Sequence, residues 1–175
     1  MKFTVDMLTR GVDFERFKKA YWSDAFNSVV VAEANLIECT VCEHVTLPDG
    51  KLRRRIRVVP RMELPTTLLK FLEGHTIRYE EVMLLDPVAR KARLDVHTIA
   101  GDLLQVGADA DFIEQPQGLL MRLQTEANVK LFGVSGMIER HLANEVRSRY
   151  VLVGQALQRF VDAGRDLEAA AAAGR

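Results

Sequence analysis

The chain has 175 residues, of which 48% are hydrophobic and 27% charged, as in an ordinary globular domain. Lysine and arginine together number 24, as do aspartate and glutamate, so no net charge draws the chain to nucleic acid or to an anionic membrane. No segment approaches the ~20 consecutive apolar residues of a membrane span, and the charged N-terminal segment lacks the pattern of a secretory signal. We therefore expect a cytoplasmic protein that binds no nucleic acid and does not insert stably into a membrane.

The first part of the chain predicts one strand and two short helices. Residues 1–8 alternate between apolar and polar side chains, which is the pattern of a strand with one wet face. Asp13 is a candidate N-cap for a helix that carries Phe17 on its apolar side. Ser23 is a candidate N-cap for a second helix, which we expect to extend to Val31.

The middle of the chain predicts an antiparallel meander. Turn sequences such as Pro48-Asp49-Gly50 and Asp86-Pro87 separate segments in which apolar and polar side chains alternate. In the first of these segments, Ile37, Cys39 and Val41 share one face. Strands with one wet face, joined by short turns, pair with their neighbours in antiparallel fashion. The expected strands are residues 36–45, 52–62, 76–85, 92–100, 103–112 and 119–131.

An apolar segment at residues 64–74 interrupts this meander. Thr66 is a candidate N-cap for it, and Gly74 is a C-terminal stop signal. We therefore expect a short helix or lid between two of the strands.

The last third of the chain predicts one long amphipathic helix. From Val134 to Val161 the apolar side chains recur at spacings of three and four, which indicates a helix of about thirty residues with one buried face. We expect its early edge, at Met137 and His141, to line a cavity. Residues 164–175 are rich in alanine, and we expect a frayed or disordered tail there. The side chains expected to pack on the sheet are Ile138, Leu142, Val146, Val153 and Leu157.

The order of these elements over residues 1–163 resembles the helix-grip fold of the START-like superfamily, also called SRPBCC, which includes the birch-pollen-allergen-like proteins. Residues 127–139, ANVKLFGVSGMIE, are similar to a bacterial START-like family of unknown function, in which a strand leads through a glycine-containing turn into a helix. Residues 78–82, RYEEV, with Asp86-Pro87, resemble the PRELI-type branch of lipid-transfer domains.

This resemblance implies a single α+β domain over residues 1–163, in which a curved antiparallel β-sheet wraps around a long C-terminal α-helix. It further implies an apolar tunnel for a lipid, a sterol, a polyketide or a similar ligand. It implies no shared catalytic residue, because members of the superfamily perform different chemistry on one scaffold.

Few residues indicate metal binding or a cofactor. Cys39 and Cys42 form a CxxC pattern, but side chains three apart in a strand point to opposite faces and cannot share one ion. The four histidines lack metal-ligand spacing, and no phosphate-binding loop or hydrolase motif is present. We therefore expect neither a metal nor a cofactor.

Three arginines, Arg53, Arg55 and Arg57, share one face of a strand. They could form an anion-binding stripe for a lipid headgroup or an acidic partner. They could instead lie on a solvent face and pair across to acidic residues of the next strand, such as Glu80 or Glu81. We favour the second interpretation.

The leading hypothesis is non-enzymatic binding or transport of a hydrophobic small molecule, with a lipid as the first candidate. The ligand would occupy a cavity between the inner face of the sheet and the long helix, with residues 64–72 as its gate. The expected ligand-binding residues are Val58, Met62, Leu68, Phe71, Tyr79, Met83, Val96, Met121, Leu123, Met137 and His141.

Two alternatives remain open at this point. The first is a cyclase- or dehydratase-like enzyme on the same scaffold, which would need a polar group inside the cavity such as His141 with Glu145 or Arg149. The second is a protein-interaction module with a collapsed cavity, which would use the arginine strand against an acidic partner.

Overall fold

The computed structural model describes residues 1–61, 78–98, 101–130 and 135–165. Its strands and helices follow the predicted order, apart from the segment at residues 64–74, which lies outside the described residues. Ordered along the chain, they are β1 (Lys2–Arg10), α1 (Phe14–Tyr21), α2 (Asp24–Glu33), β2 (Leu36–Thr46), β3 (Leu52–Pro60), β4 (Tyr79–Asp86), β5 (Lys91–Thr98), a 3₁₀ turn (Gly101–Leu103), β6 (Leu104–Gln115), β7 (Gly118–Val129) and α4 (Ser135–Asp162).

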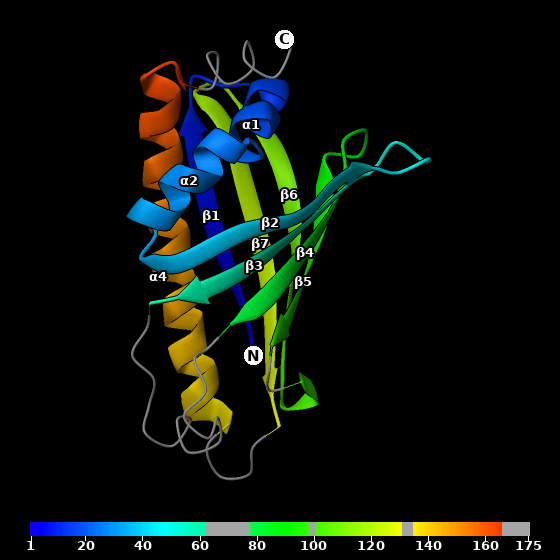
Figure 1. Cartoon of the computed structure of the whole chain (residues 1–175), viewed down its shortest axis with the longest axis vertical. Helices are drawn as coiled ribbons and strands as arrows, with labels where there is room; N and C mark the ends of the chain where they lie inside the picture. Colours follow the sequence, from blue (N-terminus) through cyan, green and yellow to red (C-terminus); the bar gives the residue numbers. More distant parts are fainter. Residues whose placement is uncertain (62–77, 99–100, 131–134, 166–175) are drawn as a thin grey trace.

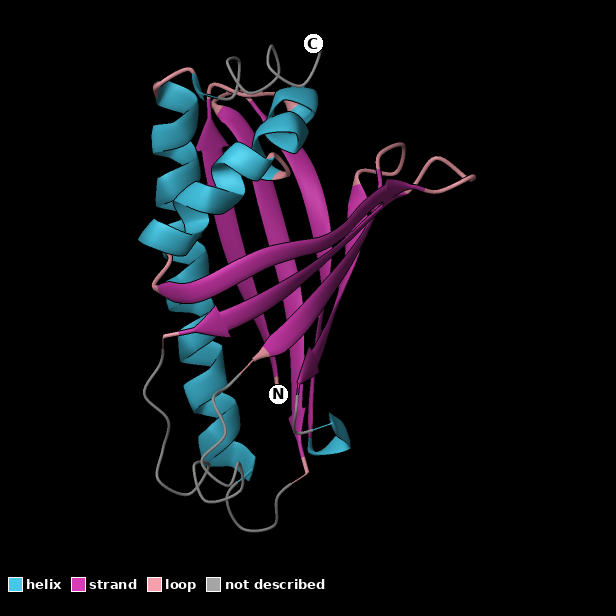
Figure 2. Ribbon diagram, in the orientation of Figure 1, coloured by secondary structure: helices cyan, strands magenta, loops and turns pink. Residues whose placement is uncertain are grey.

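One antiparallel sheet contains the seven strands in the order β1-β7-β6-β5-β4-β3-β2. The chain thus forms a meander from β2 to β7, and β1 extends the sheet by pairing with β7, with Lys2 opposite Glu126 and Arg10 opposite Gly118. The sheet curves around α4, while α1 and α2 lie near the C-terminal half of that helix (Figure 1). This arrangement confirms the predicted α+β helix-grip architecture, as the two colours of Figure 2 make plain.

Local capping explains where the two short helices begin. The Asp13 carboxylate accepts a hydrogen bond from the Arg16 backbone N–H at 2.8 Å, and the Ser23 hydroxyl accepts one from the Phe26 N–H at 3.0 Å. Each bond satisfies a donor that the first helical turn leaves without a backbone partner. Both predicted N-caps are therefore confirmed.

The long helix α4 is anchored at both ends. Near its start, the Glu139 carboxylate accepts a hydrogen bond from the backbone N–H of Val129 at 3.2 Å, which ties the helix to the end of β7. Near its other end, the rings of Phe160 and Phe26 lie 5.4 Å apart, within an apolar cluster formed with α1 and α2. The helix ends at Asp162, and most of the alanine-rich tail lies outside the described residues, so the domain boundary at residue 163 stays a prediction.

The prediction that Ile37 and Cys39 share one face of their strand is wrong. The pairing of β2 with β3 shifts by one residue between Leu36 and Glu38, which is a β-bulge. A bulge places two residues of one strand opposite one residue of the other and so changes the face of a side chain. Leu36 and Cys39 are therefore buried, whereas Ile37 is 55% exposed.

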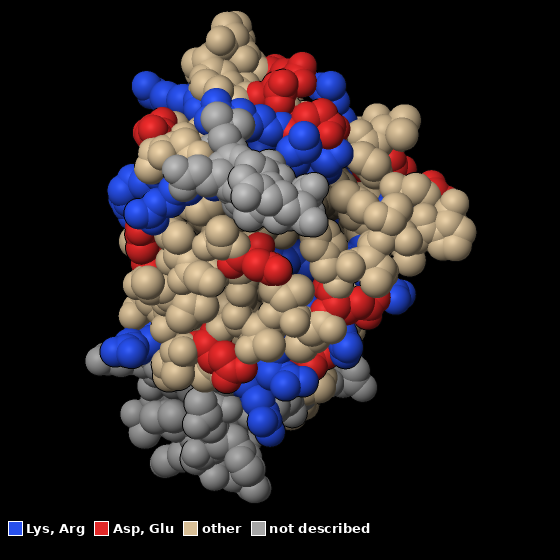
Figure 3. Space-filling view, turned by 45° about the horizontal axis from the view of Figure 1, so that its top comes forward, with Lys and Arg blue, Asp and Glu red and all other residues tan. Residues whose placement is uncertain are grey.

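The described part of the chain contains no helix that combines the length and the apolar character needed to cross a bilayer. Acidic and basic side chains alternate on the face shown in Figure 3 rather than gathering by sign among the described residues.

Replacing Gly118 by alanine should destabilise the fold severely. Its φ of +148° is one that side chains rarely adopt, and an added Cβ would lie 2.1 Å from the backbone oxygen of Thr9 in β1. We expect Gly118→Ala to lower the free energy of unfolding by more than about 2 kcal/mol, measured by urea denaturation.

Gly136→Ala is the matched control, because a Cβ there meets nothing within 4 Å and the residue lies in the first turn of α4. It should be neutral or stabilise by up to about 1 kcal/mol. Equal unfolding midpoints for the two variants would contradict the close approach of β7 to β1.

Candidate functional site

A cavity of about 200 Å³ lies between the concave face of the sheet and α4. Side chains from α1, α2, β2–β7 and α4 contribute to its wall. The cavity is therefore not collapsed, and its lining divides into an apolar part and a polar part.

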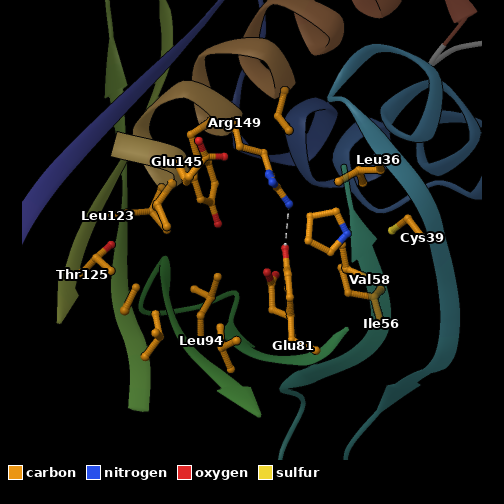
Figure 4. A pocket seen from close by; sticks show the side chains of 18 of the residues that line it. Leu36, Cys39, Ile56, Val58, Glu81, Leu94, Leu123, Thr125, Glu145 and Arg149 are labelled. Carbon is orange, nitrogen blue, oxygen red and sulfur yellow. Dashed lines mark hydrogen bonds between the residues drawn. The ribbon is translucent and has the colours of Figure 1, made fainter. Parts of the chain in front are cut away.

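The apolar part belongs to the strands in the middle of the sheet and to one side of α4. The structure describes every residue of β5, β6 and β7. Among the lining residues of these strands, only Thr98 and Thr125 have polar side chains. Figure 4 shows Leu94 and Leu123 on this side of the cavity. The apolar lining side chains of these strands and of α4 are Leu94, Val96, Leu104, Val106, Ala108, Leu123, Leu142, Val146 and Val153.

The polar part of the lining comes from α1, α2, β2, β3, β4 and α4. Its charged members are Arg54 from β3, Glu81 from β4, and Glu145 and Arg149 from α4. Uncharged polar groups surround them, and these are Tyr21, Asn27, Cys39, Tyr79 and Tyr150. The lining therefore combines a mostly apolar surface with four charged side chains.

Asn27 fixes the position of Arg54. Its Oδ1 accepts hydrogen bonds from Arg54 Nη2 at 3.0 Å and from the Cys39 thiol at 3.2 Å. Its Nδ2 donates to the backbone oxygen of Cys39 at 2.8 Å. One amide thus connects α2 with β2 and β3, and it holds a buried guanidinium in a single place.

Arg149 reaches across the cavity from α4 to β4. Its Nη1 donates a hydrogen bond to the Tyr79 hydroxyl at 3.3 Å, which is the dashed line in Figure 4. Burial raises the pKa of Tyr79 to about 12, although the neighbouring Arg149 acts in the opposite direction. The phenol therefore stays neutral and is available as a hydrogen-bond donor to a ligand.

Glu81 lies beside this pair (Figure 4). Burial raises its pKa above the ordinary value of 4.5, and the positive charges of Arg54 and Arg149 offset this only in part. No described residue forms an ion pair with Glu81 within 4 Å, and part of its surface faces the cavity. Burial therefore makes this carboxyl a weaker acid than an exposed glutamate.

The cysteines do not form a shared site. Cys39 is buried and Cys42 is half-buried, and both are free thiols. Burial raises the pKa of the Cys39 thiol to about 11, so it is not an activated nucleophile. Within the described residues, no group of three His, Cys, Asp or Glu side chains is arranged to hold a metal ion.

Several of the expected ligand-binding side chains lie on the cavity wall, namely Val58, Tyr79, Val96 and Leu123. Met83 and Met121 are buried in the core but do not line the cavity. Met62, Leu68 and Phe71 lie outside the described residues. Contact of any of these residues with a ligand stays a prediction.

The expected cavity wall at the start of α4 is misplaced. Met137 is 42% exposed, and His141 is half-buried without reaching the cavity, while Glu145 and Arg149 do line it. With 3.6 residues per turn, positions four apart drift around the helix, so Met137 lies roughly 120° from Arg149. The row of residues spaced by four therefore turns away from the cavity towards the N-terminal end of α4.

The arginine strand proves to be a solvent face with cross-strand pairs. Arg55 and Arg57 bond the Glu80 carboxylate at 3.4 and 3.1 Å, and Arg53 bonds Glu43 at 2.7 Å. The expected pairing is therefore confirmed for Glu80, whereas Glu81 points to the opposite face and into the cavity.

Sequence reasoning missed Arg54 as a lining residue. The sequence does contain the information, because side chains two apart share one face of a strand. This places Arg54 on the same face as Ile56 and Val58. Three neighbouring arginines occupy outward positions of the same strand, so Arg54 is easily grouped with them on the solvent face. The same alternation places Glu81 with Tyr79 and Met83.

Replacing Glu81 by glutamine should make stability less sensitive to pH. Because the pKa of Glu81 is higher in the folded protein than in the unfolded chain, the wild type loses stability as the pH rises from about 4.5 through the folded pKa. A glutamine side chain has no charge to bury, so we expect Glu81→Gln to melt at a higher temperature than the wild type at pH 8.

This difference in melting temperature should shrink as the pH falls towards 4.5. Glu80→Gln is the control on the outer face and should show no gain at pH 8, because it loses the ion pairs with Arg55 and Arg57. A Glu81→Gln variant that is less stable than the wild type at pH 8 would contradict the raised pKa.

Comparison with known proteins gives matches at the level of structure. No protein-family model and no curated protein sequence matches the chain, so the finer resemblances to one bacterial family and to the PRELI-type branch find no support there. The fold is similar to that of TTHA0849 from Thermus thermophilus, with 12% identity, a TM-score of 0.65 and coverage of 94% of this chain and 99% of that one.

Two further solved structures have the same arrangement. Ara h 8.0201 has 8% identity and a TM-score of 0.60, over 90% of this chain and 97% of that one. The Zhui aromatase/cyclase from Streptomyces sp. R1128 has 10% identity and a TM-score of 0.53, over 92% and 94%. Identities this low establish the fold and not the activity. The chain has the START-like helix-grip fold.

Proposed function

We propose that this chain binds a hydrophobic small molecule in the cavity between the sheet and α4 and carries it without transforming it. The observation that supports this proposal is a cavity of about 200 Å³ whose wall from β5, β6, β7 and α4 is mostly apolar. An apolar ligand that fills it recovers dispersion contacts and leaves water at the same time.

The volume limits the kind of ligand. An apolar cavity of roughly 150 Å³ accommodates a benzene molecule. The cavity of about 200 Å³ is larger than this and partly open to solvent, so it admits a ring system or a single alkyl chain. A lipid of this kind is single-chained or compact, and a phospholipid with two long acyl chains exceeds the space. Each methylene buried contributes about 0.8 kcal/mol.

We place this carrier in the cytoplasm, as the sequence suggested. The balance of 24 basic and 24 acidic residues supports a protein that exchanges its ligand without firm attachment to an anionic surface.

An enzyme of the cyclase or dehydratase kind is the second candidate, because the cavity is not lined by hydrocarbon alone. The carboxyl of Glu81, with its raised pKa, lies on the same wall as the Tyr79–Arg149 pair and could act as a general acid. Several solved structures with this fold are described as aromatase/cyclases, which supports testing for a cyclisation reaction. Turnover that disappears in Glu81→Gln, followed by mass spectrometry, would favour this candidate over a carrier.

The proposal predicts that filling the cavity abolishes ligand binding. Val106 lines the cavity from β6, and Val106→Phe adds a ring to its apolar part. We expect the wild type to enhance the fluorescence of the neutral dye N-phenyl-1-naphthylamine, and native mass spectrometry to show a co-purifying hydrophobic ligand. Val106→Phe should lose dye binding by at least tenfold in affinity, because the dye and the new ring compete for one space.

Gln105→Phe is the matched control, since the neighbouring side chain is exposed on the outer face of the same strand. It should bind the dye as the wild type does. Failure of the wild type to bind the dye or any hydrophobic ligand would contradict the proposed function, as would equal binding by Val106→Phe.

A further inference from the structure

The polar part of the cavity contains two cationic side chains that lack an ionic partner among the described residues. Arg54 is 9% exposed, and its Nε is buried without a hydrogen-bond partner there. Arg149 donates to the neutral hydroxyl of Tyr79. In the part of the chain that the structure describes, no carboxylate lies within 4 Å of either guanidinium. A buried cation in this position favours an anion that the protein itself does not supply.

We propose that the ligand is an amphipathic monoanion, whose carboxylate is bound between Arg54 and Arg149 and whose apolar body lies against β5, β6 and β7. This inference rests on the proposed binding function and specifies the chemical class of the ligand for that same cavity.

The two arginines come from different elements of the cavity wall, β3 and α4. Arg54 is held from β3 by Asn27 on α2, which accepts from its Nη2 at 3.0 Å. Arg149 extends from α4 towards β4, as Figure 4 shows. Guanidinium groups bind carboxylates with directional, charge-assisted hydrogen bonds. A carboxylate between the two guanidinium groups would receive donors from two separate elements, with the Tyr79 hydroxyl as a neutral donor at the same place.

The charge balance supports one negative charge on the ligand. The lining contains two arginines and two glutamates. Burial raises the pKa of Glu81, and a protonated glutamate in the lining leaves one arginine charge without a counter-charge. A monoanion neutralises this excess, whereas a neutral ligand leaves it in place.

The other groups that face Glu81 do not change this balance near neutral pH. Burial holds the pKa of the Cys39 thiol at about 11 and that of Tyr79 at about 12. It also raises the pKa of the Tyr21 and Tyr150 hydroxyls above their ordinary value. The charged neighbours are Arg54 from β3 and Glu145 and Arg149 from α4, while β5, β6 and β7 contribute no charged side chain to the lining.

The geometry also divides the ligand into two parts. Hydrocarbon covers the wall formed by β5, β6 and β7, where Leu94, Val106 and Leu123 face the cavity. The guanidinium groups come from β3 and α4. A molecule with a charged end and an apolar body matches both parts of the lining at once, and a uniformly apolar molecule matches only one.

Isothermal titration calorimetry with matched probes tests this inference. The probes are decanoic acid, decanol and methyl decanoate, with a naphthoic acid and its alcohol as a second, ring-shaped set. At pH 7.5 we expect each acid to bind at least tenfold more tightly than its alcohol or ester. Acids and alcohols that bind equally would overturn the inference but leave the proposed function standing. Absence of binding by every probe would contradict both.

Charge-removing variants locate the anion. Arg54→Gln and Arg149→Gln should each weaken binding of the acid by at least tenfold and change binding of the alcohol by less than threefold. Arg55→Gln is the control for β3, because Arg55 lies on the outer face with Glu80. Arg140→Gln is the control for α4, because Arg140 is exposed. Retained alcohol binding shows that a variant is folded.

Glu81→Gln gives an independent readout. Ionisation of Glu81 at rising pH would add a negative charge next to the ligand carboxylate and weaken its binding. We therefore expect Glu81→Gln to bind decanoate more tightly than the wild type at pH 9, and the difference to shrink towards pH 6. Comparing the two proteins at each pH cancels the titration of the ligand. Weaker binding of decanoate by Glu81→Gln at pH 9, or full affinity in Arg54→Gln and Arg149→Gln together, would overturn the inference.

Discussion

The constraint on which this structure depends is the mismatch between a seven-stranded curved sheet and the single long helix it surrounds. The helix α4 packs chiefly on β1 and β7, and its C-terminal half packs on α1 and α2. One helix about 10 Å wide cannot cover the inner face of so many strands. The inner face of β3 to β6 therefore borders a cavity of about 200 Å³. At one edge of the sheet α4 completes the core, and away from that edge it leaves the cavity unfilled.

Strand alternation decides which charges enter that space. Along β3, Arg53, Arg55 and Arg57 point outward and meet carboxylates on the solvent face, whereas Arg54 points inward. On β4, Glu80 is outside and Glu81 is inside. A shift of one residue in the register would turn Arg54 and Glu81 outward and their neighbours inward. The register of the sheet therefore determines which charged side chains line the cavity. Asn27 then fixes Arg54, which is the inward group with the least freedom.

Much of the fold could be predicted from the sequence because its signals are local and periodic. Clean alternation gave the strands, capping residues gave the starts of α1 and α2, and spacing by three and four gave α4. The bulge at Ile37 could not be predicted, because it arises from pairing with β3 and not from the side chains of β2 themselves. Met137 and His141 lie away from the cavity for a different reason, since positions four apart drift around a helix of 3.6 residues per turn.

The site was predicted in outline and not in its chemistry. Val58, Tyr79, Val96 and Leu123 follow from face assignments alone, and all four reach the cavity. Arg54 and Glu81 follow the same alternation. Charged residues are mostly found on the solvent face, however, so their charge favours an outward position for both. Asn27, the partner of Arg54, and Arg149, the partner of Tyr79, come from distant parts of the chain, and only the fold brings these pairs together.

A crystal structure of the protein grown with decanoic acid is the most direct test of the central claim that this cavity binds an apolar ligand. The account predicts continuous electron density for the ligand between α4 and the strands β5, β6 and β7. Its alkyl chain should lie against Val106 and Leu123, and its carboxylate should lie between Arg54 and Arg149. A cavity filled by the protein's own side chains, or a ligand bound only on the outer surface of the sheet, would contradict it.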